Sequence, residues 1–299
     1  MLLWSHHRFS FPLPQRHRFP ASKYPLLAER VEAERLGTIA DSPPVGWDAL
    51  SLVHDAALLE RIRTGELTVR EERTLGLPWS AELVERARRA TGGTVEAARD
   101  ALRHGVGMNL GGGTHHAGRE TARGYCLVND VAVATAVLRP DRVLVVDCDV
   151  HQGDGTAELL GPDPDAFTLS LHCARNYPFT RIPSDLDVDL PAGTNDDDYL
   201  AALDEALDTA LAAGRPALSF YLAGADAWEG DRLGRLGLTK AGLRRRDEHV
   251  LARLGAEGVP VCVLLAGGYA PDVRDTVDIN LATVREVVRA SQLADSPTV

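Results

Sequence analysis

Two adjacent histidines, His115 and His116, follow a run of three glycines and are well placed in this chain for acid–base chemistry. A second polar segment, Asp147-Cys148-Asp149-Val150-His151, directly follows the apolar run 143–146. Imidazole nitrogens and carboxylate oxygens bind catalytic metal ions, and a further pair of histidines can transfer protons. A protein core has no packing use for so many polar groups, because burying them without partners is costly. Together the two segments predict a metal-assisted hydrolase.

The spacing of the second segment favours metal binding. In an extended chain Asp147, Asp149 and His151 point to one face. Same-face neighbours are roughly 6–7 Å apart, since a strand rises about 3.3 Å per residue. Asp149 and His151 can converge on one ion from that spacing, whereas Asp147 sits deeper and can orient a neighbour. Asp226, after the apolar run 218–223, is the expected third ligand. Two carboxylates and one imidazole leave positions open for water and substrate, as in catalytic zinc sites.

A histidine pair beside a metal needs hydrogen-bond partners that fix the tautomer of each ring. Asp147 and Asp154 are the available partners. Tyr269, behind Gly267 and Gly268, can donate its hydroxyl to a developing oxyanion. A tyrosine that only packs is the alternative for this position.

Other polar motifs are weaker. His6, His7, His17 and His54 are scattered, and we interpret each as structural or solvent-facing. No dinucleotide-binding glycine fingerprint and no phosphate-binding loop is present.

The candidate residues lie at the ends of apolar segments in a region where strands and helices alternate. Strands are predicted at 106–110, 143–146, 166–171, 217–223 and 259–266, and helices at 128–138, 154–160, 198–213, 239–254 and 273–290. Continuous apolar strands alternating with helices indicate a parallel sheet covered on both faces. Ligands of such sheets bind beyond the carboxyl ends of the strands, so these residues are predicted to share one site.

The first hundred residues give a less regular pattern. Residues 1–24 are rich in proline and are predicted to be extended, and residues 64–79 are predicted to form a loop. Helices are predicted at 25–36, 48–63, 80–90 and 94–103. With 299 residues and 44% hydrophobic content, the whole chain, 1–299, is expected to form a single catalytic domain.

Charge and composition exclude several classes of protein. The formal net charge of −11 argues against a nucleic-acid binder but is compatible with a cationic substrate. The longest apolar run, 259–266, is too short to span a bilayer. The apolar stretch at the amino terminus is too short for a signal peptide. The four cysteines form no C-x-x-C pair and are expected to be buried, reduced thiols. A cytoplasmic protein of bacterial composition is therefore expected.

At this point the chain resembles the arginase–deacetylase fold, specifically the zinc-dependent histone deacetylases and their bacterial, class IV-like members. The motifs that carry the resemblance are Gly111-Gly112-Gly113-Thr114-His115-His116-Ala117, Gly124-Tyr125-Cys126-Leu127-Val128-Asn129-Asp130, Asp147 to Gly155, Ser170-Leu171-His172, Gly224-Ala225-Asp226 with Gly230-Asp231, and Gly267-Gly268-Tyr269. Their order and spacing fit the family across about residues 100–275.

The resemblance implies a single-domain, three-layer α/β fold with a central, mostly parallel sheet. It implies zinc bound by Asp149, His151 and Asp226. The acid–base pair would be His115 with Asp147 behind it and His116 with Asp154 behind it, and Tyr269 would be the oxyanion donor. Gly124, Tyr125 and Gly268 would contact the substrate, with Tyr177 or Phe179 as the second channel wall. A potassium site would use Asp147, Asp149, His151, Ser170 and Leu171, partly through backbone oxygens.

The leading hypothesis is therefore a zinc-dependent amidohydrolase that removes acyl groups from lysine side chains of proteins. An acetylpolyamine amidohydrolase, with a small acylated amine as substrate, is the nearest alternative. A two-manganese ureohydrolase would need more bridging carboxylates than Asp149 and Asp226 provide. A non-catalytic module that binds acyl-lysine or metal would not need His115, His116 and Tyr269.

Overall fold

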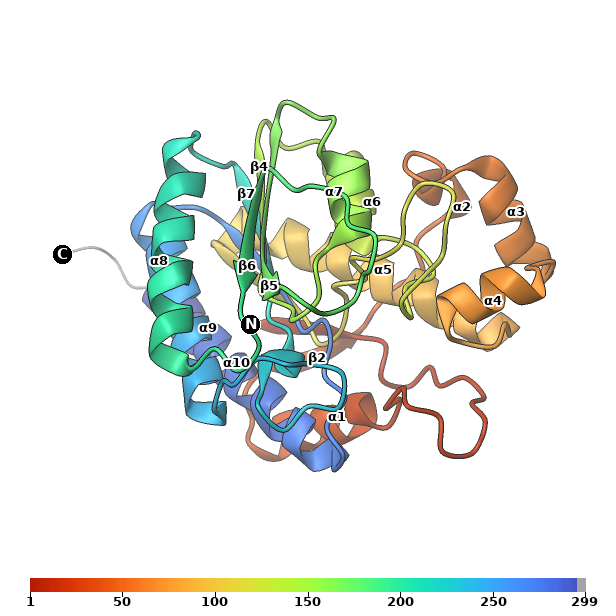
Figure 1. The fold of residues 1–299 in the computed structure, drawn as a ribbon, viewed down its shortest axis with the longest axis horizontal. Coiled ribbons are helices and arrows are strands. Elements are labelled where there is room, and N and C mark those ends of the chain that lie inside the picture. Colours follow the sequence, from red (N-terminus) through yellow and green to blue (C-terminus); the bar gives the residue numbers. More distant parts are fainter. Residues whose placement is uncertain (295–299) are drawn as a thin grey trace.

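One eight-stranded sheet organises the computed structural model, which describes residues 1–294 (Figure 1). The strands are β1 (Leu2–Ser5), β2 (Thr38–Asp41), β3 (Val106–Asn109), β4 (Val143–Asp147), β5 (Ala166–Cys173), β6 (Leu186–Leu190), β7 (Leu218–Leu222) and β8 (Val261–Leu264). Their order is β2-β1-β3-β8-β7-β4-β5-β6, and all neighbours run parallel. The predicted three-layer α/β fold is confirmed, and the sheet is entirely rather than mostly parallel.

Helices cover both faces of this sheet. They are α1 (Lys23–Ala33), α2 (Trp47–Leu50), α3 (Ala56–Thr64), α4 (Val69–Leu75), α5 (Ala81–His104), α6 (Asp130–Leu138), α7 (Asp154–Leu160), α8 (Asp196–Ala212), α9 (Lys240–Ala256) and α10 (Val273–Ala294), with a 3₁₀ turn η1 at Ala225–Ala227. Figure 1 shows α8, α9 and α10 on one side of the sheet and α5 and α6 on the other.

Strand β4 shows why the sheet must be covered twice. Leu144 and Val146 pack into the cluster formed with α8, α9 and α10, whereas Val143 and Val145 pack into the cluster formed with α5 and α6. Successive side chains of a strand point to opposite faces, so an all-apolar strand needs a hydrophobic layer on each side. This burial holds the carboxyl ends of β4, β7 and β8 side by side.

Several predicted elements differ in the amino-terminal third. Residues 1–24 contain β1, which pairs with β2 and with β3, and both β1 and β2 were missed because each has only four residues. The predicted helix 48–63 is two helices, because the Asp55 side chain caps a new helix by accepting from the N–H groups of Ala57 and Leu58.

The predicted loop 64–79 contains a helix, and the predicted pair of helices at 80–90 and 94–103 is one. Thr68 and Glu71 form a capping box that starts α4, a signal that was present in the sequence. Gly92 and Gly93 do not break α5. A Cβ at Gly92 would lie 1.9 Å from the carbonyl oxygen of Pro43, so this glycine allows close packing instead. The edge strand β6 was also missed.

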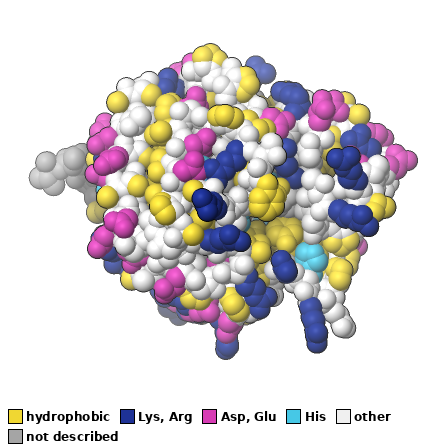
Figure 2. Space-filling model, in the orientation of Figure 1, with side chains coloured by type: hydrophobic (Ala, Val, Ile, Leu, Met, Phe, Trp, Pro, Cys, Tyr) yellow, Lys and Arg dark blue, Asp and Glu magenta, His cyan; other side chains and the backbone are white. Residues whose placement is uncertain are grey.

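The surface and the cysteines complete the description. On the face drawn in Figure 2, hydrophobic side chains gather in a hollow near the middle, with Lys or Arg side chains around it. All four cysteines are buried and unpaired, as expected. Across residues 1–294, no helix combines the length and the hydropathy that a bilayer crossing requires.

Candidate active site

Three loops meet where β4, β7 and β8 end. These strands are neighbours in the sheet, so the segments that follow them emerge at one edge. Asp149 and His151 follow β4, Asp226 lies in η1 after β7, and Gly267 follows β8. The Asp149 carboxylate accepts a hydrogen bond from the Gly267 N–H at 2.8 Å, which joins two of the loops. The predicted convergence of these segments is confirmed.

Asp149, His151 and Asp226 form a buried cluster with the geometry of a metal site. Each offers one ligand atom, and these atoms lie within 4.8 Å of one another. Asp226 is fully buried, its Oδ1 accepts from the Val150 N–H at 3.0 Å, and its Oδ2 has no hydrogen-bond partner among the described residues. A carboxylate oxygen buried without a partner is costly, and a bound cation would satisfy it.

The charges of the cluster support the same fit. Burial and the nearby Asp149 raise the pKa of Asp226 to about 6. Although burial acts the other way, the neighbouring carboxylates of Asp149 and Asp226 raise the pKa of His151 to about 10. Two buried carboxylates thus attract protons to the cluster, and a divalent cation would take their place.

Gly267 makes room for these carboxylates. A Cβ at this position would lie 1.9 Å from Asp226 Oδ2 and 2.5 Å from Asp149 Oδ2. Any larger residue would therefore collide with two candidate metal ligands. Close packing at the centre of the site therefore explains why position 267 is a glycine.

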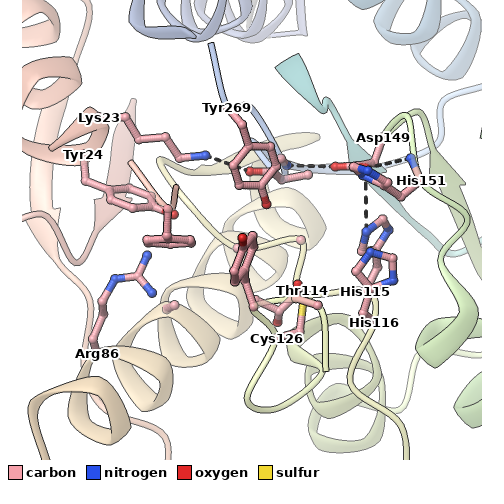
Figure 3. Close-up of a pocket in the computed structure, with 18 of the residues that line it drawn as sticks. Lys23, Tyr24, Arg86, Thr114, His115, His116, Cys126, Asp149, His151 and Tyr269 are labelled. Atoms are coloured by element: carbon pink, nitrogen blue, oxygen red, sulfur yellow. Dashed lines mark hydrogen bonds and ion pairs between the residues drawn. The ribbon is translucent and has the colours of Figure 1, made fainter. Parts of the chain in front are cut away.

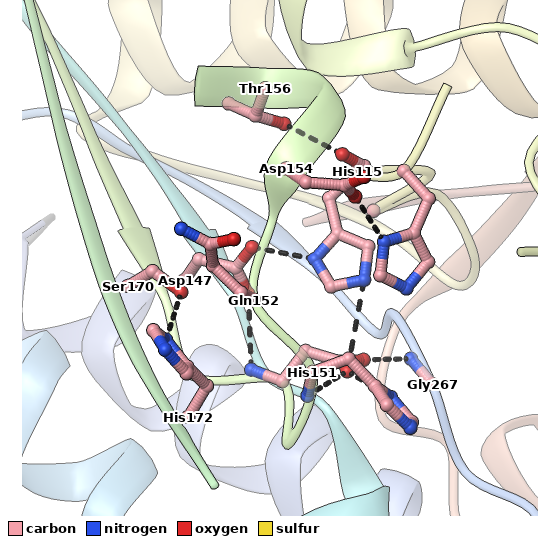
Figure 4. Close-up of polar contacts among 12 residues, drawn as sticks. His115, Asp147, His151, Gln152, Asp154, Thr156, Ser170, His172 and Gly267 are labelled. Carbon is pink, nitrogen blue, oxygen red and sulfur yellow. Dashed lines mark hydrogen bonds and ion pairs between the residues drawn. The ribbon is translucent and has the colours of Figure 1, made fainter. Parts of the chain in front are cut away.

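The two adjacent histidines each have a carboxylate partner (Figure 4). His115 Nδ1 lies 2.6 Å from Asp147 Oδ2, and His116 Nδ1 lies 2.6 Å from Asp154 Oδ1. The two rings are 4.1 Å apart between centroids, and both side chains are buried. Each Nδ1 is thus occupied, which leaves Nε2 for chemistry at the cavity, and His115 Nε2 lies 3.7 Å from Asp149 Oδ1.

The histidines differ in their electrostatics. Burial alone would lower the pKa of His115, but Asp147 and Asp149 outweigh it and raise the pKa to about 9. Burial and the neighbouring His115 lower the pKa of His116 to about 4, although Asp154 opposes this shift. One cluster therefore contains two adjacent imidazoles with opposite proton affinities.

Aromatic rings line the approach to the histidines. Tyr177 stands nearly perpendicular to the His116 ring at 4.8 Å between centroids, whereas Phe179 is 93% exposed. Of the two residues predicted as alternatives for the second channel wall, Tyr177 is thus the one that packs against His116. Tyr125 faces Tyr269 at 5.7 Å, and Gly124 also lines the cavity. The Tyr269 N–H donates to Asp231 Oδ2 at 2.6 Å, which fixes the backbone behind this ring.

The residues of the implied potassium site lie at and after the carboxyl end of β4 and within β5. Ser170 is buried, and its Oγ lies 2.9 Å from His172 Nδ1. Ser170 pairs in register with Asp147 across the two strands. Leu171 is the next residue of β5.

Sequence reasoning missed several residues around the site. Arg123 Nε lies 2.9 Å from Asp154 Oδ2, so the carboxylate behind His116 has a cationic partner. His6 is not solvent-facing. It lines the cavity that also contains His115, His116, Asp149 and His151, which we name the inner cavity. Lys23 and Arg86 line the same cavity (Figure 3). His6 lies before α1, Lys23 lies in the first turn of α1, and Arg86 lies in α5. No sequence motif marks any of the three.

The comparisons with known proteins agree with this geometry. The model of the histone deacetylase domain matches residues 17–284. An uncharacterised protein of Picosynechococcus sp. is 42% identical over 91% of this chain and 93% of its own length. Histone deacetylase 2 of Arabidopsis thaliana is 38% identical over 61% of this chain, and the match covers 49% of the plant protein.

The solved structure of a histone deacetylase homologue from Aquifex aeolicus superposes with a TM-score of 0.82 at 25% identity, covering 96% of this chain and 83% of that one. The chain belongs to the histone deacetylase family. Membership supports a hydrolase that acts on amide bonds, with deacetylase activity in the general sense.

Proposed function

We propose that this protein is a zinc-dependent amidohydrolase that removes acyl groups from lysine side chains, with residues 1–299 as one catalytic unit. One observation carries the proposal. Two histidines, each held at Nδ1 by its own carboxylate, line the same cavity as Asp149 and His151, which form a candidate metal cluster with Asp226. Binding alone would not need two such pairs, whereas amide hydrolysis needs both a base and an acid.

The metal would be held by Asp149, His151 and Asp226, and when bound it would supply Lewis-acid polarisation of the amide carbonyl and a more acidic water. The remaining work falls to residues of this chain. Nε2 of His115 and Nε2 of His116 would take the proton of the attacking water and deliver a proton to the leaving amine. Asp147 and Asp154 would keep both rings oriented through each proton transfer.

Tyr269 would stabilise the oxyanion that develops on the acyl carbonyl. Burial, with Asp226 and Asp149 nearby, raises the pKa of its phenol, so the hydroxyl stays available as a donor. Its ring lines the inner cavity and also a neighbouring groove, which we name the outer groove. A donor at this place acts on charge that exists only in the transition state. The potassium site of Asp147, Asp149, His151, Ser170 and Leu171 remains a prediction that accompanies this proposal.

The outer groove favours an acyl-lysine peptide over an acylated polyamine. Its volume is about 380 Å³, and its described lining comprises Arg18, Thr74, Leu75, Gly76, His116, Gly124, Tyr125, His151, Asn176, Tyr177, Phe179, Leu233 and Tyr269. No Asp or Glu is in this lining, so the distal ammonium of a polyamine finds no carboxylate there. Exposed Phe179 instead offers an apolar surface at the entrance.

A substrate panel tests the proposal. The metal-loaded protein is given an Nε-acetyl-lysine peptide, Nε-butanoyl and longer acyl-lysine peptides, and acetylputrescine. We expect hydrolysis of at least one acyl-lysine peptide, with a higher kcat/KM than for acetylputrescine. Preferred hydrolysis of acetylputrescine would instead indicate an acetylpolyamine amidohydrolase. No hydrolysis of any member by protein of verified zinc content would refute the proposal.

A further inference from the structure

Two spaces meet at the candidate active site, the outer groove described above and an inner cavity behind it. Both are lined by His116, Gly124, Tyr125, His151 and Tyr269. Under the proposed function, a lysine side chain enters from the groove and presents its amide bond to these shared residues. The acyl group then points into the inner cavity, so the lining of that cavity selects which acyl groups are accepted.

The far end of the inner cavity is basic. Figure 3 shows Lys23 and Arg86 at the end opposite Asp149 and His151, with Tyr269 between them. Lys23 is 2% exposed and Arg86 is 8% exposed, and His6, which also lines the cavity, is 1% exposed. Lysine is rare in this chain, at positions 23 and 240 alone, and Lys23 is directed into the catalytic cavity.

These groups have no acidic partner. Within residues 1–294 neither Lys23 nor Arg86 forms an ion pair, and both ring nitrogens of His6 are without a hydrogen-bond partner. Lys23 Nζ donates one hydrogen bond, to the carbonyl oxygen of Ala266 at 3.2 Å. Two of its three hydrogens remain, and a buried cation without a counter-charge is unfavourable. Among the described residues, no carboxylate therefore neutralises this end of the cavity.

Aromatic rings hold the cations in place without neutralising them. Arg86 Cζ lies 5.2 Å from the ring centroids of Phe11 and Phe19 and 4.6 Å from that of Tyr24. Lys23 Nζ lies 5.7 Å from the Tyr269 ring centroid, so the ammonium borders the catalytic part of the cavity. Although burial acts in the opposite direction, the charges of Lys23 and Arg86 lower the pKa of Tyr24. A positive field thus persists at this end.

We propose that Lys23, Arg86 and His6 bind a carboxylate at the distal end of the acyl group. The preferred substrates are then lysines acylated by a short dicarboxylic acid, such as malonyl-, succinyl- or glutaryl-lysine. A cavity of about 50 Å³ admits a short chain only. In the reaction, water oxygen bonds to the acyl carbon, the carbon–nitrogen bond breaks, and the amine leaves with a proton. The products are the free dicarboxylate and the unmodified lysine.

The proposal rests on the proposed function, and its test compares charged and neutral acyl groups of equal length. We expect wild-type kcat/KM for the succinyl-lysine peptide to exceed that for the butanoyl-lysine peptide by about 10-fold or more, the scale of one buried charge-assisted contact. Lys23→Met keeps the aliphatic stem and removes the charge, and should lower this ratio by a similar factor. Lys23→Arg should restore much of it, and Arg86→Gln should lower it independently of Lys23.

Lys240→Met is the matched control, because Lys240 also lies over an aromatic ring, that of Trp228, but outside the cavity. The ratio should not change in this variant. Wild-type preference for butanoyl-lysine, or a ratio unaltered by Lys23→Met, would overturn the anion site while leaving deacylation intact. Failure of the metal-loaded wild type to hydrolyse any acyl-lysine peptide would instead refute the proposed function.

Calorimetry with succinate gives a readout that does not depend on turnover. Succinate should bind the metal-loaded wild type and the Lys240→Met variant, and should bind the Lys23→Met variant at least about 10-fold more weakly. Equal binding to all three proteins would contradict the site.

Discussion

The two ends of the inner cavity carry opposite charges, and each contains buried charged groups whose counter-charge is incomplete. At one end Asp149 and Asp226 are buried carboxylates, and Asp226 Oδ2 accepts no hydrogen bond from the described residues. At the other end Lys23 and Arg86 are buried cations that no carboxylate of residues 1–294 pairs with, and Tyr269 stands between the two ends (Figure 3). The acidic end needs a metal and the basic end needs an anion. A polarised cavity of this kind can orient a substrate whose acyl group is itself charged.

Removal of a carboxylate at the acidic end should have the largest effect. Asp226→Ala is expected to abolish metal binding and hydrolysis while the fold is kept, because Asp226 lies in a short turn after β7 and not within the sheet. Metal content by elemental analysis, together with the circular dichroism spectrum, checks this. Asp197→Ala removes an exposed carboxylate of α8 and should change neither quantity. Full zinc content in Asp226→Ala would disprove the ligand set.

Loss of one histidine of the pair should leave the metal but not the chemistry. His116→Ala is expected to lower kcat by about 10²-fold or more, the usual scale of acid–base catalysis. His249→Ala is the matched control, since His249 forms a similar pair with Asp204 at 3.0 Å on the surface. Wild-type turnover in His116→Ala would make the pair structural.

Tyr269→Phe removes one hydroxyl between the two ends. We expect kcat to fall by roughly 10²–10³ with a much smaller change in KM, since the oxyanion exists only in the transition state. Tyr199→Phe, which removes a buried hydroxyl from a residue of α8, controls for stability. A raised KM at unchanged kcat would make Tyr269 a wall of the channel only.

A buried histidine with both nitrogens satisfied sharpens the contrast with His6. His54 Nδ1 donates to the Gly118 carbonyl at 2.9 Å, and Nε2 accepts from the Asn129 N–H at 2.9 Å. Burial lowers the pKa of His54 to about 4, so this side chain is neutral in the folded protein. The unfolded chain binds its proton near the ordinary value of about 6.5.

The stability that His54 contributes is therefore complete above about pH 6.5 and is lost as the pH falls toward about 4, by roughly 3 kcal/mol in all. Urea unfolding of the wild type and of His54→Gln across this range measures the difference. The variant should be less stable at neutral pH, and its stability should change less with pH. Parallel curves would contradict the assignment.

The sequence predicted for a physical reason that the residues of the acidic end lie together, as they do in the structure. Asp149, His151, Asp226 and Tyr269 follow apolar strands of a parallel sheet, and such strand ends meet at one edge. Short elements were harder, because four residues such as β1 give too little periodicity. Gly92 and Gly93 appeared to break a helix, whereas they allow Pro43 and Ser42 to lie close against α5.

The basic end could not be predicted from spacing. His6, Lys23 and Arg86 are brought together only by the packing of the amino-terminal segment against α1 and α5. Each is ordinary in its local sequence. The scarcity of lysine was the one signal available, and it becomes meaningful only once the burial of Lys23 is known.

The most direct test of the central claim is a zinc titration of chelator-treated protein, followed by hydrolysis of one acyl-lysine peptide. We predict no hydrolysis without metal and a linear rise that saturates at one zinc ion per chain, since Asp149, His151 and Asp226 form one cluster. Hydrolysis that persists in fully metal-free protein, or that needs two ions per chain, would contradict the account.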